Sequence, residues 1–374
     1  MKIAVNTRFL LPGRLEGFGW YTHEIVRRMV RQHPEDEFLF FFDRPFDPRF
    51  VYGPNVTPLV LFPPARHPIL WWLWFEQAVP RVLRKHRADV FFSPDSYLSL
   101  RSEVPTVMTC HDIVPLHQPE SIPFATRKYY QHYLPKFLRR ADHVLTVSEY
   151  VRQDIVQTVG LDPGKISVAY NGCRETFVPL QEVEKQKIRQ QFSNGQEYFF
   201  YTGAIHPRKN IPRLIRAFDL FKQKTGAPVK LLLAGRLAWQ TSDVTAALEQ
   251  SRYRADIHLL GYVPEETLPK LMASAVALTY VSLSEGFGLP MLEAMHTDTP
   301  VLAANATCLP EIAGDAALLV DPMSENAMAQ GLEKLWKDRV FGQNLVARGK
   351  VQRERFSWEV AAEKVYGVLE QATY

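Results

Sequence analysis

The fold class is clearest at residues 276–295, which read VALTYVSLSEGFGLPMLEAM. The apolar run at 276–281 is typical of a short strand buried in a parallel sheet. Gly286 and Gly288 then allow the backbone to approach a ligand closely, and Pro290 suits the first helical position, where its missing N–H costs no hydrogen bond. The segment therefore predicts a strand, a glycine loop and a helix whose unpaired first amides form an anion site.

Short apolar runs alternate with longer helical patterns on both sides of this segment. Such alternation is typical of an α/β fold in which helices cover both faces of a doubly wound parallel sheet. Strands are expected at residues 2–8, 38–43, 56–62, 89–93, 106–109, 143–148, 165–170, 198–203, 229–235, 257–263, 276–281, 301–304 and 317–320. Helices are expected at residues 20–32, 69–86, 124–140, 149–159, 210–224, 264–274, 289–296, 324–337, 340–355 and from 357 to about 371.

The chain length and one polar stretch divide the sequence. A chain of 374 residues is more than twice the ~150 residues of a typical single domain. Residues 181–196 carry little apolar periodicity. We predict a first Rossmann-like domain at 1–178, a linker at 179–196, a second Rossmann-like domain at 197–356 and a helix at 357–374, for which a return to the first domain stays open. Because open parallel sheets bind ligands beyond the carboxyl ends of their strands, we expect the site in the cleft between two facing domains.

The composition excludes several classes of protein. With 46% hydrophobic and 22% charged residues, the chain is typical of globular proteins rather than collagenous or disordered ones. The cysteines Cys110, Cys173 and Cys308 are odd in number and form no Cys-x-x-Cys pair, so neither a disulfide framework nor a zinc knuckle is predicted. A charge at Arg8 interrupts the first apolar run too early for a signal peptide, and we expect a cytoplasmic protein.

Contact with the inner face of the membrane stays open as an alternative. The net charge of +4 arises in residues 1–180, which hold 22 Lys and Arg against 18 Asp and Glu. Ordinary solvated charge explains this excess, and an anionic lipid partner is the alternative. The aromatic segment 69–75 (ILWWLWF) is too short to span a bilayer, which needs ~20 residues. It either borders a bilayer or packs in the core, and core packing is favoured because its tryptophans share no single helical face. Four basic residues follow it: Arg81, Arg84, Lys85 and Arg87.

A second strand, loop and helix segment, YTGAIHPRKN at residues 201–210, presents two adjacent cations. A fixed Arg208 and Lys209 pair near a helix start would stabilise negative charge on a bound anion. A surface basic pair is the alternative. The chain contains no Asp-x-Asp, so the usual carboxylate ligands of a metal ion that bridges phosphates are missing. We therefore expect these cations to act in place of Mg²⁺.

Two features in the first half also follow predicted strands. Gly17 and Gly19 precede a helix, but residue 22 is Thr22, so the Gly-x-Gly-x-x-Gly fingerprint of dinucleotide binding is not met. His111, followed by Asp112, comes directly after a buried strand and is expected to reach the cleft. An ordinary turn and a structural histidine are the respective alternatives.

The Glu-x7-Glu spacing of Glu285 and Glu293, with Gly-Phe-Gly-Leu-Pro after the first glutamate, resembles the signature of the large retaining glycosyltransferase family 4. The resemblance covers nearly the whole chain. It implies the GT-B architecture of two facing Rossmann-like domains, the first for the acceptor and the second for the donor. It further implies that Glu285 contacts the donor sugar and that Glu293 holds the nucleotide ribose. The backbone amides expected at the sugar and the diphosphate are those of Gly286, Phe287, Gly288 and Leu289.

The same resemblance assigns the remaining site residues. Arg208 and Lys209 are expected at the donor diphosphate. His111 and Asp112 are expected near the anomeric carbon, where His111 positions the sugar and stabilises charge rather than acting as a general base. The backbone of Val263 is expected at the nucleobase. Further donor contacts are expected from Gly17, Gly19 and Gly203.

The sequence thus predicts a retaining glycosyltransferase that acts in surface polysaccharide synthesis, such as that of lipopolysaccharide. It would transfer a hexose, with mannose from GDP-mannose favoured, to a hydroxyl of a glycan or a lipid-linked oligosaccharide. The nucleotide sugar is a substrate, no metal or other cofactor is expected, and nucleic acid is not an expected partner. A nucleotide-sugar 2-epimerase of the same fold is the main alternative, and a nucleotide-sugar-binding protein without catalysis is a second one.

Overall fold

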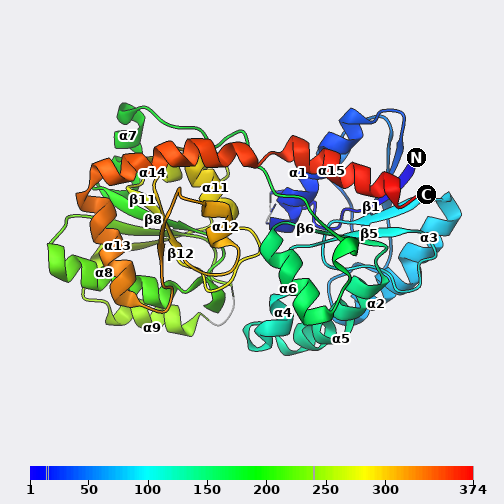
Figure 1. Cartoon of the computed structure of the whole chain (residues 1–374), viewed down its shortest axis with the longest axis horizontal. Helices are drawn as coiled ribbons and strands as arrows, with labels where there is room; N and C mark the ends of the chain where they lie inside the picture. The colour runs from blue at the N-terminus through cyan, green and yellow to red at the C-terminus, as the bar shows by residue number, and fades with distance from the viewer. Residues whose placement is uncertain (14, 16, 239–240, 374) are drawn as a thin grey trace. The chain divides into compact units, whose positions relative to one another are not determined.

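The computed structural model describes residues 1–13, 15, 17–238 and 241–373. The chain divides into two compact units, and Figure 1 shows helices flanking a sheet in each. Unit 1 comprises Met1–Asn171 and Ser357–Tyr374, and unit 2 comprises Gly172–Phe356. The division thus falls at residue 171 rather than at the predicted residue 178.

Unit 1 contains a seven-stranded sheet in the order β3-β2-β1-β4-β5-β6-β7, with every neighbouring pair parallel. The strand order reverses between β1 and β4, and a ligand of such a sheet binds beyond the carboxyl ends of the strands at this switch point. The strands are β1 (Lys2–Asn6), β2 (Glu37–Phe42), β3 (Val56–Val60), β4 (Val90–Ser93), β5 (Thr106–Cys110), β6 (His143–Thr146) and β7 (Ile166–Val168).

The helices of unit 1 cover this sheet, and their apolar residues supply its core. In α1, for example, Tyr21, Ile25 and Met29 are buried at helical spacing. The α-helices are α1 (Gly17–Gln32), α2 (Pro68–Leu73), α3 (Val79–His86), α4 (Val114–His117), α5 (Phe124–Arg140), α6 (Glu149–Val159) and α15 (Trp358–Gln371). Three 3₁₀ turns, η1 (Pro48–Phe50), η3 (Pro119–Ser121) and η4 (Pro163–Lys165), and one π-helical segment, η2 (Trp74–Ala78), complete the described part of the unit.

The aromatic segment 69–75 belongs mainly to the core of unit 1. Trp74 and Phe75 are fully buried, and the Nε1 of Trp71 donates a hydrogen bond of 2.8 Å to the Ala65 carbonyl. Core packing is therefore the correct interpretation for these aromatic rings. Ile69 is the exception, because 66% of it is exposed.

Unit 2 repeats the architecture with a six-stranded parallel sheet in the order β10-β9-β8-β11-β12-β13. The order reverses between β8 and β11, which gives this sheet its own switch point. The strands are β8 (Tyr198–Thr202), β9 (Lys230–Ala234), β10 (Ile257–Gly261), β11 (Ala277–Tyr280), β12 (Val301–Ala304) and β13 (Leu318–Val320). The helices are α7 (Glu182–Ser193), α8 (Ile211–Thr225), α9 (Ser242–Gln250), α10 (Leu268–Ser274), α11 (Leu289–His296), α12 (Leu309–Ala313), α13 (Glu325–Lys337) and α14 (Arg339–Gln352), with shorter turns η5 (Pro207–Lys209), η6 (Arg254–Asp256) and η7 (Arg353–Arg355).

The segment predicted as a linker at 179–196 instead contains helix α7. A capping box of Gln181 and Glu184 starts the helix. Arg189 then donates a hydrogen bond of 3.0 Å from Nε to the Ser274 carbonyl of α10. Caps and charged contacts stabilise this helix, and apolar periodicity alone therefore did not reveal it.

The C-terminal helix α15 packs on α1, so its contacts belong to unit 1 (Figure 1). Arg28 on α1 donates to Glu359 at 2.7 Å, and the Tyr366 hydroxyl donates to Asp36 at 2.6 Å. The His33 ring stacks on Tyr366 at a centroid distance of 3.4 Å. Across the described residues, every helix is too short or too polar to span a bilayer.

Candidate active site

The loops after β8 and β9 pass closer together than side chains would allow. Gly203 and Gly235 adopt φ angles of 138° and 146°, which glycine tolerates and other residues rarely adopt. A Cβ on Gly235 would lie 1.9 Å from the Gly203 carbonyl oxygen. Asn210 fixes the far end of the first loop, because its Nδ2 donates to the Val281 and Pro322 carbonyls at 3.0 and 2.7 Å. The predicted cations are thus carried by a rigid loop.

Lys209 and Glu285 form a buried ion pair beyond the ends of β8 and β11. They are 8% and 7% exposed, and the Lys209 ammonium contacts a Glu285 carboxylate oxygen directly. The ammonium also donates to the Tyr280 hydroxyl at 3.2 Å. Burial opposes ionisation of Glu285, yet the charges of Lys209 and Arg208 outweigh it and lower the pKa of Glu285 to about 2. Glu285 is therefore a fixed carboxylate near neutral pH, suited to accept hydrogen bonds.

The charges around this pair favour an anionic ligand. Arg208 and Lys209 are two cations beside the single carboxylate of Glu285. Burial, together with these two cations, lowers the pKa of His206 to about 4, so this histidine is neutral at pH 7. Two positive charges against one negative charge leave a net positive field at the switch point, as a diphosphate requires.

The predicted glycine loop leads directly into helix α11. Gly288 has a φ of 96°, and a Cβ on it would lie 2.8 Å from Leu309 Cδ2. The helix begins at Leu289, so Pro290 is its second residue rather than its first. Phe287 is 4% exposed and packs edge-on against Phe356 at 5.6 Å, so its side chain is part of the core.

The backbone of Glu285 is held by the residues that precede α12. The Thr307 hydroxyl accepts from the Glu285 amide at 3.2 Å, and the Cys308 thiol donates to the Glu285 carbonyl at 3.2 Å. Gly286 follows at the predicted place in the loop. The loop is thus held at both the amide and the carbonyl of Glu285 before any ligand binds.

Glu293, the predicted ribose contact, lies one turn inside α11 and is paired with Arg174. Both Nη2 and Nε of Arg174 donate to Oε1 of Glu293, at 2.6 and 3.2 Å. No motif marked Arg174 in the sequence. The sequence feature that could have pointed to it is a single cation in the irregular stretch after Asn171-Gly172.

Val263, the predicted base contact, is half-buried and lies just beyond β10. In the sheet order β10 is two positions from β8. The Gly235 amide donates to the Gly261 carbonyl at 2.7 Å, so the loops after β9 and β10 are also joined through their backbones.

In unit 1, His111 lies directly after β5 and carries its proton on Nε2. This nitrogen donates to the Pro94 carbonyl at 2.8 Å, and a carbonyl oxygen only accepts. The rings of Phe18 and Tyr21 lie 4.8 and 4.7 Å from the His111 ring. Burial lowers the pKa of His111, so the neutral ring presents Nδ1 as an acceptor. The adjacent Asp112 accepts a hydrogen bond of 3.2 Å from the Val114 amide at the start of α4.

Gly17 and Gly19 lie in the first turn of α1 rather than in a loop before it. A Cβ on Gly19 would lie 2.8 Å from the Phe9 carbonyl oxygen, whereas one on Gly17 would have open space around it. Gly19 therefore serves close packing against the chain after β1. The predicted donor contacts of both glycines stay predictions.

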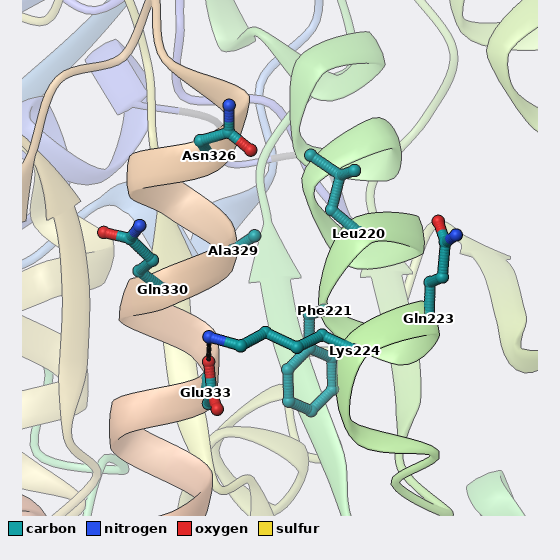
Figure 2. Close-up of a pocket in the computed structure, with 8 residues that line it drawn as sticks. All are labelled: Leu220, Phe221, Gln223, Lys224, Asn326, Ala329, Gln330 and Glu333. Carbon is teal, nitrogen blue, oxygen red and sulfur yellow. Dashed lines mark ion pairs between the residues drawn. The ribbon is translucent and has the colours of Figure 1, made fainter.

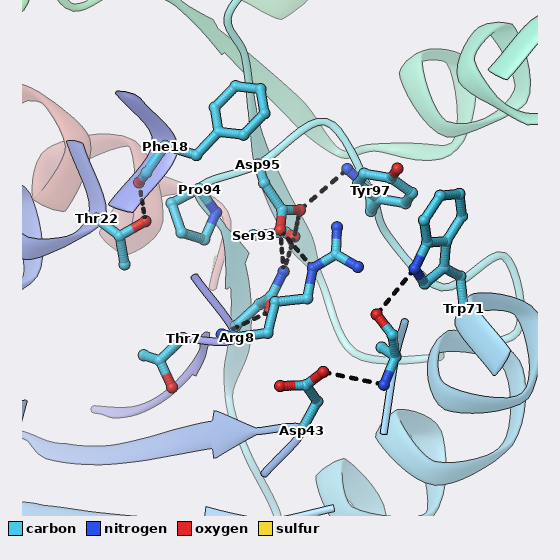
Figure 3. A network of polar contacts seen from close by, with 12 residues as sticks. Thr7, Arg8, Phe18, Thr22, Asp43, Trp71, Ser93, Pro94, Asp95 and Tyr97 are labelled. Carbon is cyan, nitrogen blue, oxygen red and sulfur yellow. Dashed lines mark hydrogen bonds and ion pairs between the residues drawn. The ribbon is translucent and has the colours of Figure 1, made fainter. Parts of the chain in front are cut away.

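A buried ion pair between Arg8 and Asp95, which sequence reasoning missed, lies at the switch point of unit 1 (Figure 3). Arg8 Nε donates to Asp95 at 2.8 Å, and the two side chains are 4% and 1% exposed. Asn6 donates to the same carboxylate oxygen at 2.9 Å, and the Tyr97 ring lies 4.1 Å from the guanidinium. Pro94, between β4 and Asp95, carries the carbonyl that binds His111.

A groove and a group of metal-ligating residue types lie away from the carboxyl ends of the strands described above. The groove, of about 360 Å³, lies between α8 and α13, and Lys224 pairs there with Glu333 at 2.7 Å. Figure 2 shows the residues that line it. None of the described residues that line it is a predicted site residue. Among the described residues, one group of metal-ligating types occurs, at His33, Glu35 and Asp36. Asp36 there already accepts from the N-terminal ammonium and a tyrosine hydroxyl, so protein donors occupy it.

Two family models match successive parts of the chain. The model described as Glycosyltransferase Family 4 matches residues 15–176, and the model described as Glycosyl transferases group 1 matches residues 182–352. The "O-antigen chain mannosyltransferase B" of Escherichia coli is 31% identical over 92% of this chain and 93% of its own length. The "O-antigen chain mannosyltransferase RfbU" of Salmonella typhimurium is 28% identical over 76% of each chain.

Solved structures agree in fold. A sucrose-phosphate synthase from Thermosynechococcus elongatus has a TM-score of 0.81 at 20% identity and covers 99% of this chain and 98% of its own. The Anabaena protein HepE in complex with UDP-glucose has a TM-score of 0.78 at 19% identity, with 99% and 100% covered. WaaG, a glycosyltransferase involved in lipopolysaccharide biosynthesis, has a TM-score of 0.78 at 15% identity, with 98% and 99% covered. At these identities the likeness establishes the fold alone.

Proposed function

The chain belongs to the glycosyltransferases of family 4, and on this premise we propose that it transfers mannose from GDP-mannose to a surface polysaccharide or its lipid-linked precursor, with retention at the anomeric carbon. The names of the relatives support mannose, because two of them are O-antigen chain mannosyltransferases. The observation that carries the proposal is the buried Lys209–Glu285 pair with Arg208 beside it.

The proposed reaction begins with the loss of the diphosphate from the donor. As the bond between the anomeric carbon and the diphosphate oxygen breaks, its electron pair stays on that oxygen. Arg208 and Lys209 would stabilise this charge, and a cation as buried as Lys209 acts more strongly than one in open solvent. Because the chain itself supplies two cations and lacks an Asp-x-Asp, we propose that transfer needs no metal ion.

The acceptor hydroxyl then forms the new bond on the same face of the sugar. Its proton passes to the departing diphosphate oxygen, which balances the charge without a protein base. Glu285 is unsuited to that task, since a carboxylate with a pKa of about 2 is a weak base. We propose that Glu285 accepts hydrogen bonds from sugar hydroxyls and that His111 accepts one at Nδ1.

Binding and transfer assays test the proposal. Wild-type protein is titrated with GDP-, UDP- and dTDP-mannose in a thermal-shift assay, in which a bound ligand raises the melting temperature. Transfer to a membrane extract or a synthetic mannoside is followed with labelled donor in the presence of EDTA. The proposal expects preference for the GDP donor, EDTA-resistant transfer and an α-linked product by NMR. Preference for a UDP donor, or a product of inverted configuration, would overturn it.

The two alternatives have their own outcomes in these assays. Donor consumption without an acceptor, giving an epimeric nucleotide sugar, would identify an epimerase. Tight donor binding without transfer to any acceptor would identify a binding protein. None of the relatives reported above is named as either.

We also propose that the protein works at the cytoplasmic face of a membrane, through a docking face formed by Val60, Phe62, Arg81, Arg84 and Lys85. Phe62 and Val60 are 84% and 53% exposed at the end of β3. They border a groove of about 370 Å³ whose other wall is helix α3. The three basic residues are exposed on that helix. Two exposed apolar side chains beside three cations fit an anionic bilayer, which takes up the apolar groups and attracts the charges.

Liposome flotation tests the docking face. Vesicles with 30% phosphatidylglycerol are expected to carry the wild-type protein upward, and Phe62→Ser with Lys85→Ser is expected to reduce the floated fraction severalfold. Val360→Ser with Lys350→Ser is a matched control, because both positions are exposed on other helices. Equal flotation of the docking-face variant and the control would exclude this surface.

A further inference from the structure

Arg174 lies at the point where the chain enters unit 2, two residues after the first residue of that unit. Its guanidinium reaches α11 and donates from both Nη2 and Nε to one carboxylate oxygen of Glu293, Oε1. The two side chains are 12% and 7% exposed. Oε2 of Glu293 takes part in neither of these hydrogen bonds.

Contacts of Arg174 with its surroundings fix the orientation of this ion pair. The guanidinium lies 4.6 Å from the centre of the Phe177 ring, a contact that favours a cation over an aromatic face. Burial alone would lower the pKa of Arg174, but the charge of Glu293 outweighs it and the pKa is raised. Arg174 therefore stays charged, and its planar fork keeps one orientation before any ligand binds.

Arg174 also lies near the loop after β10. Its Nη1 is 3.9 Å from a carboxylate oxygen of Glu265, which is half exposed and thus contributes little energy. Val263, the predicted base contact, lies two residues before Glu265 in this loop, and Glu293 is the predicted ribose contact. The guanidinium thus contacts Glu293 directly and approaches the loop that carries Val263 through Glu265.

We propose that Arg174 is a positioning residue for the donor nucleoside. By binding Oε1 of Glu293 it fixes the carboxylate so that Oε2 faces the ribose hydroxyls. A carboxylate whose one oxygen is held by two donors of the same guanidinium loses less freedom when a hydroxyl binds to the other oxygen, which increases affinity. The inference rests on the proposed function in one respect, namely that a nucleotide binds at Glu293.

A positioning role of Arg174 can be told apart from a purely structural one, because it changes the affinity for the donor more than the turnover number. In Arg174→Met, we expect the KM for the donor and the Kd for its nucleoside diphosphate to rise about tenfold, while kcat changes less than threefold. Arg174→Lys keeps the charge but loses the fork, and we expect it to recover about half of the affinity on a logarithmic scale. Arg189→Met is the matched control, because Arg189 is a partly buried arginine of the same unit that binds Ser274.

The experiment is calorimetric titration of GDP and of UDP into the wild type, these variants, Glu293→Gln and the double variant Arg174→Met/Glu293→Gln. Because Arg174 acts through Glu293, the double variant should bind no worse than Glu293→Gln alone. Arg189→Met should lower the melting temperature without changing either Kd more than twofold.

Two results would overturn the inference. One is a Kd within twofold of wild type in Arg174→Met or, if that variant does not fold, in Arg174→Lys. The other is a loss in the double variant equal to the product of the single losses, which would mean that Arg174 binds the nucleotide directly. A preference for UDP would overturn only the proposed donor, since the variants are compared on whichever nucleotide binds, and a wild type that binds neither would contradict both.

Discussion

Each unit carries a buried ion pair at the switch point of its sheet, and the two pairs differ in the charges that surround them. In unit 2, Lys209 follows β8 and Glu285 follows β11, the strands that flank the switch point. In unit 1, Arg8 follows β1 and Asp95 follows β4, which flank the other switch point. Each pair thus joins the two loops from which such sheets bind ligands.

The surroundings of the two pairs differ in charge. Around Asp95, the partners besides Arg8 are neutral, and include the Asn6 amide at 2.9 Å and the Ser93 hydroxyl at 3.2 Å. Around Glu285, a further cation, Arg208, acts on the carboxylate. In unit 1 the single cation Arg8 faces the single carboxylate of Asp95, and its Nη2 is buried without a hydrogen-bond partner among the described residues, whereas in unit 2 two cations, Lys209 and Arg208, act on the carboxylate of Glu285. The two pairs therefore differ in the number of cations around the carboxylate, and this difference is the basis on which the diphosphate is proposed to bind in unit 2.

The largest expected effect is on turnover, from Lys209→Ala. Removing one fixed donor from a developing charge typically costs a factor of about 10² to 10³ in kcat, and Lys209 also keeps Glu285 ionised. Steady-state kinetics with labelled donor measure this loss. Lys224→Ala is the control, because Lys224 is an exposed lysine that pairs with Glu333 on the helical face in Figure 2. Similar kcat values for the two variants would contradict the proposed role of Lys209 at the diphosphate.

The next effect is on stability, from Asp95→Asn in unit 1. Breaking a buried ion pair leaves an uncompensated charge, and we expect the free energy of unfolding to fall by about 3 kcal/mol. Asp47→Asn, in a largely exposed pair with Arg49, should cost less than about 1 kcal/mol. Urea unfolding measures both. A cost for Asp95→Asn no larger than that of its control would show that the pair of unit 1 is dispensable.

The contrast also explains what could be predicted from the sequence. The strands were readable because a buried parallel strand is a continuous apolar run, as at 276–281. Lys209 and Glu285 were readable because each lies beside a glycine loop. Arg8 and Asp95 stand 87 positions apart in the chain and lie beside no glycine motif, so only the parallel pairing of β1 with β4 brings them together.

Other features were missed for related reasons. Helix α7 is stabilised by its cap at Gln181 and by polar contacts rather than by an apolar stripe. Arg174 is a single cation in an irregular segment, and its role follows from a contact with Glu293, 119 positions away. Sequence patterns indicate regular elements and local motifs, whereas partners brought together by the fold require the structure.

A smaller decrease in the free energy of unfolding is expected at low pH, and it should arise from His206 and Glu285 in unit 2. The pKa of His206 falls from 6.5 in the unfolded chain to about 4 in the fold, so the unfolded state binds more protons between these values. Stability therefore decreases as the pH falls from about 6.5 to 4, by about 2 kcal/mol for this residue. The carboxylate of Glu285 adds a further loss between about pH 4.5 and 2.

Urea unfolding of the wild type and His206→Gln between pH 8 and 4 checks this effect. Other histidines with lowered pKa values, such as His23, titrate in the same window, so the difference between the two proteins isolates His206. That difference should change progressively below pH 6.5. A difference that stays constant down to pH 4 would contradict the assignment.

The most direct test of the excess charge in unit 2 is calorimetric titration of GDP into the wild type, Arg208→Ala and Asp95→Asn at pH 7.5. If the cations after β8 hold the diphosphate, Arg208→Ala should weaken binding at least tenfold, while folded Asp95→Asn should bind within twofold of the wild type. Equal affinities of Arg208→Ala and the wild type, or a larger loss in Asp95→Asn, would contradict it.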